Sequence, residues 1–143
     1  MRKRLKATLL AAVASIAGCS TYFIATYNPA VDSGATELQQ KVDVFLNDLE
    51  RTAGTPAGAY ERNAGTYDEL RGDIQTLREL ASQQRGNDLT VHSLDLIENN
   101  VDKLQAIHAD GISPKEIDIV RTLFDTQFRM LVQLENAKKR KES

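Results

Sequence analysis

Apolar residues recur at intervals of three and four along four stretches of this chain, the spacing that places side chains on one face of an α-helix. The four stripes are Leu38, Val42, Phe45 and Leu49; Tyr60, Ala64, Tyr67, Leu70, Ile74, Leu77 and Ala81; Leu94, Ile97, Val101, Leu104 and Ile107 or His108; and Ile117, Val120, Phe124, Gln127 or Phe128, Leu131 and Leu134. Four amphipathic helices of about 20 residues, joined by short connections, predict an all-α fold, an up-down-up-down four-helix bundle.

Capping and turn residues lie between the stripes and set the expected helix boundaries. These are Thr36 and Gly54 for the first helix, Thr55-Pro56 and Gly86 for the second, Thr90 and Gly111 for the third, and Ser113-Pro114-Lys115-Glu116 for the start of the fourth. The last of these combines an N-cap hydroxyl, proline at the first helical position and a carboxylate three residues on, which is a capping box. It is the best-defined helix start in the chain.

The second predicted helix contains Gly58, Gly65 and Gly72, seven residues apart and away from its apolar stripe. Each glycine costs about 1 kcal/mol relative to alanine inside a helix. One interpretation is a smooth face where another helix approaches closely. The other is a tolerated solvent-facing feature with an irregular first turn.

Charged residues on the second and third helices predict how these two helices pair. In an antiparallel hairpin that turns near residues 86–89, Arg78 would face Asp95 or Glu98, and Arg71 would face Asp102. Exposed ion pairs contribute about 0 to 1 kcal/mol each, so they set register more than stability. An alternative is a carboxylate stripe that binds a cation or a basic partner.

The first eighteen residues have the pattern of an export signal. Arg2, Lys3, Arg4 and Lys6 precede the uncharged, mostly apolar run from Ala7 to Ala17. This run has the length of a signal-peptide apolar region and is too short for a membrane-spanning helix, which needs about 20 apolar residues. Cys19, the only cysteine, follows the small residues Ala17 and Gly18.

The segment Ile16-Ala17-Gly18-Cys19 resembles the lipobox of bacterial lipoproteins. The resemblance implies that the Cys19 thiol receives a diacylglycerol, that the chain is cut before it, and that the new amino terminus is acylated. An ordinary secretory signal with a chance cysteine is the alternative. Because Ser20 rather than Asp follows the cysteine, the resemblance further implies the outer membrane of a Gram-negative host, on the periplasmic side, with the inner membrane as the less favoured site.

These features divide the chain into four parts: a signal peptide at 1–18, a lipidated tether at 19–35, the bundle at 36–137 and a basic tail at 138–143. Aromatic and apolar residues of the tether, Tyr22, Phe23, Ile24 and Tyr27, are expected either at the membrane interface or packed on the bundle. Four passes return the chain to its starting end. The tail is therefore expected beside the tether.

The basic run Lys138, Lys139, Arg140 and Lys141 has two interpretations. It is either a solvated helix end whose cations favour the negative pole of the helix dipole, or a contact with anionic lipid headgroups, worth about 1 kcal/mol per residue near the surface. Without the leader, fourteen of the eighteen Lys and Arg remain against twenty Asp and Glu, a formal net charge of −6 rather than −2. Such an acidic domain is not suited to nucleic acid.

No set of residues in the sequence predicts a catalytic site, a metal site or a cofactor other than the lipid. His92 and His108 lie about 160° apart around one helix and cannot share an ion, and His108 is expected to be a satisfied or half-exposed residue at the end of its stripe. His92-Ser93 is an adjacent pair whose side chains point in different directions. Tyr60 and Tyr67 are expected to pack in the core.

The helical part of the chain, including the ending Leu134-Glu135-Asn136-Ala137-Lys138-Lys139-Arg140, resembles small helical lipoproteins of Gram-negative bacteria that have no assigned activity. We therefore expect a non-enzymatic, lipid-anchored envelope protein with a structural or protein-interaction role. The alternative is a module that binds a small apolar or cationic ligand between its helices. Partners would be the membrane and another envelope protein or a second copy; Val44, Leu46, Ile119 and Val132 are candidates for a dimer face.

Overall fold

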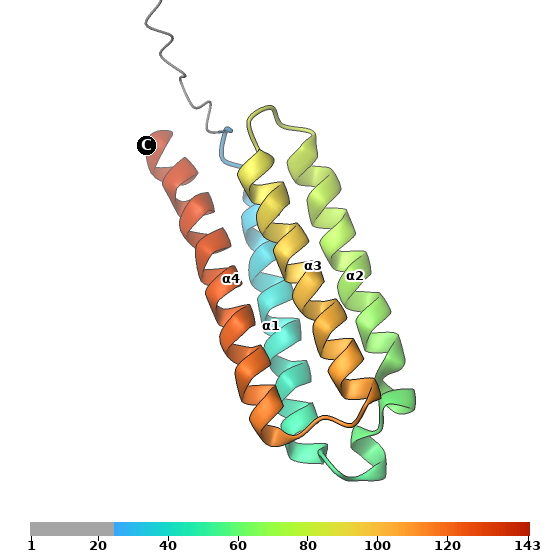
Figure 1. Ribbon diagram of the computed structural model, residues 1–143. Coiled ribbons are helices and arrows are strands. Elements are labelled where there is room, and N and C mark those ends of the chain that lie inside the picture. Colours follow the sequence, from blue (N-terminus) through green and yellow to red (C-terminus); the bar gives the residue numbers. More distant parts are fainter. Residues whose placement is uncertain (1–24) are drawn as a thin grey trace, which may run out of the picture.

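The computed structural model describes residues 25–143, which form four long helices packed side by side (Figure 1). The helices are α1 (Pro29–Thr52), α2 (Tyr60–Ser82), α3 (Asp88–Ala109) and α4 (Pro114–Lys141), with a short 3-10 helix, η1 (Pro56–Gly58), between α1 and α2. α1 packs against α2 and α4, and α3 packs against the same two helices from the other side. This is the up-down-up-down bundle that the apolar spacing predicts.

One continuous core fills the space between the helices. It extends from Val31 to Leu131, and Tyr67, Phe124 and Phe128 are its largest fully buried side chains. Burying an apolar side chain of this kind contributes about 1.5 to 3 kcal/mol, so the core dominates the stability of the fold. Where the sequence left two choices, the buried residues are His108 rather than Ile107 and Phe128 rather than Gln127.

The first helix starts seven residues earlier than predicted, so the segment from Pro29 to Ala35 is helical and not part of a tether. The side-chain oxygen of Asn28 accepts a hydrogen bond from the backbone N–H of Ala30 at 3.0 Å. Asn28-Pro29, within the stretch assigned to the tether, is therefore an N-cap followed by proline at the first helical position. Val31 and Ala35 are buried against the rest of the core.

The glycines of the second predicted helix do not share one face. Thr55-Pro56 opens η1 instead of α2, and Gly58 lies where an added Cβ would collide with the backbone of Thr52. In α2, Gly65 and Gly72 are exposed, and a Cβ there would meet no described atom within 4 Å. These two glycines agree with the solvent-facing interpretation.

The helix ends agree in part with the capping prediction. Gly54 and Gly111 follow the C-caps of α1 and α3 with φ angles of 73° and 97°, in the left-handed region that favours glycine. Ser113 and Glu116 form the predicted capping box of α4. By contrast, α2 ends at Ser82, before Gly86, and α3 starts after Asn87 rather than at Thr90.

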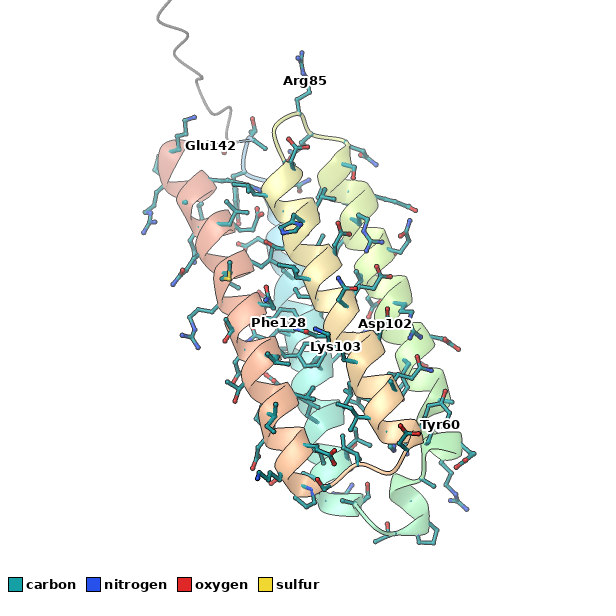
Figure 2. All side chains as sticks on the ribbon, in the orientation of Figure 1. Tyr60, Arg85, Asp102, Lys103, Phe128 and Glu142 are labelled. Atoms are coloured by element: carbon teal, nitrogen blue, oxygen red, sulfur yellow. The ribbon has the colours of Figure 1, made fainter. Side chains whose placement is uncertain are left out.

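The ion pairs that fix the register of α2 and α3 are those predicted. Arg78 Nε lies 2.9 Å from Asp95 Oδ1, and its Nη2 contacts Glu98. Arg71 Nη2 lies 2.7 Å from Asp102 Oδ1, on the surface where Figure 2 labels Asp102. Burial alone would lower the pKa of Arg78, but its hydrogen bonds with Glu98 and Asp95 more than offset that effect and raise it.

The two ends of the described chain lie together, as four passes require. The backbone N–H of Tyr27 donates to Glu142 Oε1 at 2.6 Å, which joins the segment before α1 to the end of α4. Figure 1 shows both at the same end of the bundle. Within residues 25–143, no helix is both long enough and apolar enough to cross a bilayer.

Candidate functional site

The predicted lipidation site, Cys19, lies outside the described residues, as do Tyr22, Phe23 and Ile24 of the predicted tether. The described chain begins at Ala25, which is buried, and reaches α1 through Tyr27 and Asn28. The residues around this entry point are therefore the part of the bundle closest in sequence to Cys19.

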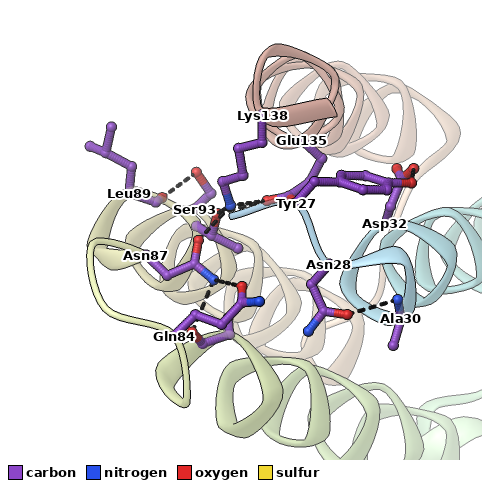
Figure 3. Close-up of polar contacts among 12 residues, drawn as sticks. Tyr27, Asn28, Ala30, Asp32, Gln84, Asn87, Leu89, Ser93, Glu135 and Lys138 are labelled. Atoms are coloured by element: carbon purple, nitrogen blue, oxygen red, sulfur yellow. Dashed lines mark hydrogen bonds and ion pairs between the residues drawn. The ribbon is translucent and has the colours of Figure 1, made fainter. Parts of the chain in front are cut away.

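Tyr27 connects this entry segment to both α1 and α4, and Figure 3 shows its hydrogen bond to Asp32 of α1. Its hydroxyl donates to Asp32 Oδ2 at 2.6 Å, and the Nζ of Lys139 lies 5.5 Å from the centre of its ring. The hydrogen bond to Asp32 raises the pKa of the Tyr27 phenol above its ordinary value. With the backbone bond to Glu142, Tyr27 fastens the start of the bundle to its last helical turn.

A cluster of buried polar residues lies at the same end of the bundle as Tyr27 (Figure 3). It is made of Asn87, Thr90, Glu135 and Lys138. Lys138 Nζ donates to Glu135 Oε1 at 2.6 Å, to Thr90 Oγ1 at 2.7 Å and to Asn87 Oδ1. The hydroxyl of Thr90 donates to Glu135 Oε1 at 2.7 Å. The cluster therefore joins the end of α4 to the start of α3.

Because of this cluster, the predicted headgroup contact of Lys138 is wrong. Lys138 is only 2% exposed and its three ammonium protons have protein acceptors. Glu135 and Lys138 continue the core spacing of Phe128 and Leu131 at steps of four and three, a signal that the charge run obscured. Lys139, Arg140 and Lys141 are exposed and lie in the last turn of α4, so the predicted basic tail is helical up to Lys141.

Thr90 has a role that capping signals did not indicate. Asn87 occupies the N-cap position of α3, which leaves the Thr90 hydroxyl free to bond Glu135 across the core. The second carboxylate oxygen of Glu135 has no hydrogen-bond partner among residues 25–143. Lys138 thus supplies the counter-charge that offsets most of the free-energy cost of burying the Glu135 carboxylate.

A second polar cluster lies at the opposite end of the bundle, where Figure 2 labels Tyr60. His108, only 3% exposed, bonds the Tyr67 hydroxyl through Nδ1 at 2.7 Å and the Gly58 carbonyl through Nε2 at 2.8 Å. Because a carbonyl only accepts, Nε2 carries the proton and Nδ1 accepts from Tyr67. Burial raises the pKa of Tyr67, which keeps its hydroxyl protonated.

These contacts show that His108 is a satisfied buried residue and that Tyr67 belongs to the core, as predicted. Tyr60 is half-buried and accepts a hydrogen bond from Gln105 Nε2 at 2.7 Å. His92 is exposed on α3, apart from this cluster. In the part of the chain that the structure describes, no three His, Cys, Asp or Glu side chains come together in a way that could hold a metal ion.

The surface groove between α1 and α2 is the feature that the sequence did not indicate. It has a volume of about 530 Å³, and the residues that line it are Glu37, Gln40, Lys41, Val44, Phe45, Asp48, Asn63, Thr66, Glu69 and Leu70. Phe45 and Leu70 are buried and form its apolar base with Val44, which is 61% exposed. We call this feature the α1–α2 groove.

Val44 was one of four residues expected on a dimer face, and the structure does not bring the four together. Leu46 is fully buried in the core, so its assignment to an outer face is wrong. Val132 is half-buried, and Ile119 is exposed on α4, whereas Val44 lines the α1–α2 groove.

The chain matches no protein-family model, no curated protein and no solved structure.

Proposed function

We propose that this protein is a non-enzymatic lipoprotein of the bacterial envelope, which holds a four-helix bundle at a membrane surface and contacts another envelope protein there. The observation that carries the proposal is Cys19 at the end of Ile16-Ala17-Gly18-Cys19, after a basic and then apolar leader. Two or three acyl chains at this position hold a protein on a bilayer, whereas a single chain binds only marginally.

The fold supports a short connection between the anchor and the bundle. Pro29, the first residue of α1, lies ten positions after Cys19, a reach of at most about 36 Å for an extended chain. Tyr27 already contacts α1 and α4, so Cys19 lies only eight positions before a residue that is fixed to the bundle. The bundle would therefore stay close to the membrane, with the end that contains Tyr27 facing the membrane surface.

The exposed cations at this end suit contact with anionic headgroups. Lys139, Arg140 and Lys141 are exposed in the last turn of α4, and Arg85 is exposed in the α2–α3 loop at the same end (Figure 2). Each cation near an anionic surface contributes about 1 kcal/mol. These residues would keep the bundle end-on.

Vesicle binding tests this orientation. A soluble chain of residues 20–143 would be mixed with phosphatidylglycerol vesicles, and the triple variant Lys139→Gln, Arg140→Gln and Lys141→Gln compared with a charge-matched variant. The matched changes are Lys103→Gln, Lys115→Gln and Arg129→Gln, at exposed positions away from this end. We expect only the first variant to lose binding; equal loss in both would overturn the contact.

The anchoring itself is tested by fractionation of a Gram-negative host that expresses the full chain. We expect the protein in the outer-membrane fraction with incorporated palmitate. Cys19→Ala should remain an unprocessed precursor without label. Recovery of the unaltered chain as a soluble, unlabelled periplasmic protein would overturn the proposal.

A non-enzymatic role is favoured by the way the buried ionisable groups are used. Lys138 pairs with Glu135, and His108 bonds Tyr67 and Gly58, so both clusters are engaged in holding helices together. The second candidate function is a module for a small apolar or cationic ligand. The α1–α2 groove favours it, because acidic side chains surround an apolar base there.

A further inference from the structure

The α1–α2 groove is long and open rather than enclosed. On α1 its lining extends from Glu37 to Asp48, about 16 Å at the rise of an α-helix, and on α2 from Asn63 to Leu70. Sites for small molecules usually bury most of the ligand surface in a closed cleft. A shallow groove two to three turns long instead matches the side of a helix.

The base of the groove offers one exposed apolar residue on a rigid support. Val44 is 61% exposed, the highest value among the large apolar side chains of residues 25–143. Its neighbour Phe45 is held edge-on against Tyr67, with ring centres 5.2 Å apart. An apolar side chain laid over Val44 would remove it from water without disturbing the core.

The rim of the groove is acidic. Glu37, Asp48 and Glu69 are exposed along it. The single lining cation, Lys41, already bonds Asp73 at 2.5 Å, and this hydrogen bond raises the pKa of the Lys41 ammonium. Asp48 has a neighbour in Arg51, at 2.9 Å, but both side chains are largely exposed and are available to other charges.

From this arrangement we propose that the α1–α2 groove is a docking site for a basic, amphipathic helix of a partner protein. Apolar residues of that helix at positions i, i+3 or i+4, and i+7 would cover Val44 and the base. Lysine or arginine on its flanks would face Glu37, Asp48 and Glu69. This inference rests on the proposed interaction role and specifies the partner's chemistry.

A second copy of this chain is a poorer occupant. On α4 the exposed apolar residues are Ile119, Leu123 and Met130, and the exposed carboxylates Asp118 and Asp125 lie next to Ile119 and two residues after Leu123 in sequence. These carboxylates would meet the acidic rim, and like charges placed together oppose association. A helix with basic flanks from another protein is therefore the better match in charge.

A synthetic helix tests the groove directly. The probe is a fifteen-residue peptide of leucine and lysine, with leucine on one helical face and fluorescein at its amino terminus. The control peptide has the same composition in an order that places leucine on all faces. Fluorescence anisotropy would measure both against residues 20–143, a chain that contains the whole core and whose helix content is checked by circular dichroism.

The decisive pair of variants adds one positive charge, in the groove or outside it. Val44→Lys and Ile119→Lys each replace an exposed apolar residue by a cation, on α1 and on α4. Because Val44→Lys removes an apolar contact and adds repulsion, we expect it to weaken peptide binding about tenfold, equivalent to about 1.4 kcal/mol. Ile119→Lys should leave the dissociation constant within about twofold of the unaltered value.

A second matched pair tests the rim. Asp48→Asn with Glu69→Gln should weaken binding, whereas Asp118→Asn with Asp125→Asn, an equal change of net charge, should not. Equal effects of the two pairs, or equal binding of the two peptides, would mean non-specific charge attraction and would overturn the proposal. Binding of spermidine at the groove without binding of the peptide would also overturn it, in favour of the small-ligand module.

Self-association of the chain is the remaining alternative to a partner helix in the groove. If the chain alone forms dimers in sedimentation experiments and Val44→Lys dissolves them, the groove belongs to a second copy and the proposal is wrong. The peptide assay uses a chain that lacks Cys19 and its lipid. A failure of the peptide to bind would therefore say nothing against the lipid anchor. Conversely, an unmodified Cys19 would remove the membrane location and leave peptide binding unaffected.

Discussion

The ammonium group of Lys138 lies 2.6 Å from Oε1 of Glu135, and both side chains are withdrawn from solvent in the middle of what the sequence presents as a polar helix end. The pair bonds Thr90 and Asn87, at the start of α3. It therefore fixes the end of α4, next to which the chain enters the bundle. The geometry of this end depends on an internal ion pair as well as on apolar packing.

Replacing Glu135 by leucine should destabilise the bundle strongly, because Lys138 would keep a buried charge with no counter-charge. Breaking a buried ion pair typically costs about 3 to 5 kcal/mol. The free energy of unfolding in urea measures the effect. Arg140→Met, at an exposed residue of the same helical turn, is the control and should change it by less than about 0.5 kcal/mol.

The double variant Glu135→Leu with Lys138→Met should recover much of that loss, since no uncompensated charge remains. If Glu135→Leu and Arg140→Met lower the free energy of unfolding by the same amount, the buried pair does not hold this end together.

Replacing Tyr67 by phenylalanine should destabilise the other end of the bundle. The change removes the hydroxyl that donates to His108 Nδ1 and leaves a buried acceptor unpaired, which costs about 1 to 3 kcal/mol. Tyr60→Phe is the control, because Tyr60 is half-buried and Gln105 can turn to solvent. Urea unfolding should show the larger loss for Tyr67→Phe; the reverse order would contradict this assignment.

The number of helices, most residues of their core faces and the α2–α3 register could be predicted from the sequence, because each depends on short-range spacing. Arg78 with Asp95 and Glu98, for example, follows from counting outward from the turn. The start of α1 could not be fixed in this way. Asn28-Pro29 is compatible with a turn and with a helix N-terminus, and burial of Val31 decides between them.

Substitution of glycines should distinguish an open surface from a helix contact. Gly72→Ala should stabilise the protein by about 0.5 to 1 kcal/mol, because alanine favours the helix and its Cβ meets open space. At Gly34 the Cβ would collide with the buried side chain of Leu77. Thermal unfolding should therefore give a lower midpoint for Gly34→Ala than for Gly72→Ala, and equal midpoints would argue against close packing of α1 on α2 at Gly34.

Glu116 should make stability depend on pH in the acid range. Hydrogen bonds from the Ser113 hydroxyl and backbone N–H lower the pKa of Glu116 below its ordinary value of 4.5. A carboxyl with a lowered pKa contributes stability that is complete above the unfolded value and is lost as pH falls through the folded value. The difference in unfolding free energy between the unaltered chain and Glu116→Gln should therefore be constant near neutral pH and shrink below about pH 4.5.

Ser113→Ala is the control for this dependence, because it removes the hydroxyl that lowers the pKa of Glu116. In the Ser113→Ala variant, the change in unfolding free energy caused by Glu116→Gln should vary less with pH. An undiminished pH dependence there would show that the capping box is not its source.

The candidate site could be predicted less well than the fold. Spacing places Lys138 on the core face of α4 and Lys139 off it, but no apolar residue marks that face there. The acceptors that make burial of the Lys138 cation possible belong to α3 and the residue before it, some 48 to 51 residues away. The α1–α2 groove likewise could not be predicted, because its existence depends on the distance between α1 and α2 in the folded bundle. Its acidic rim combines Glu37 and Asp48 of α1 with Glu69 of α2, which no single stretch of sequence brings together.

The most direct test of the central claim is mass spectrometry of the protein purified from the envelope of a Gram-negative host that expresses the full chain. We predict that the amino-terminal peptide begins at Cys19 and carries the mass of a diacylglycerol with an additional acyl chain. A mature protein that retains an unmodified Cys19 thiol, or that starts at another residue, would contradict it.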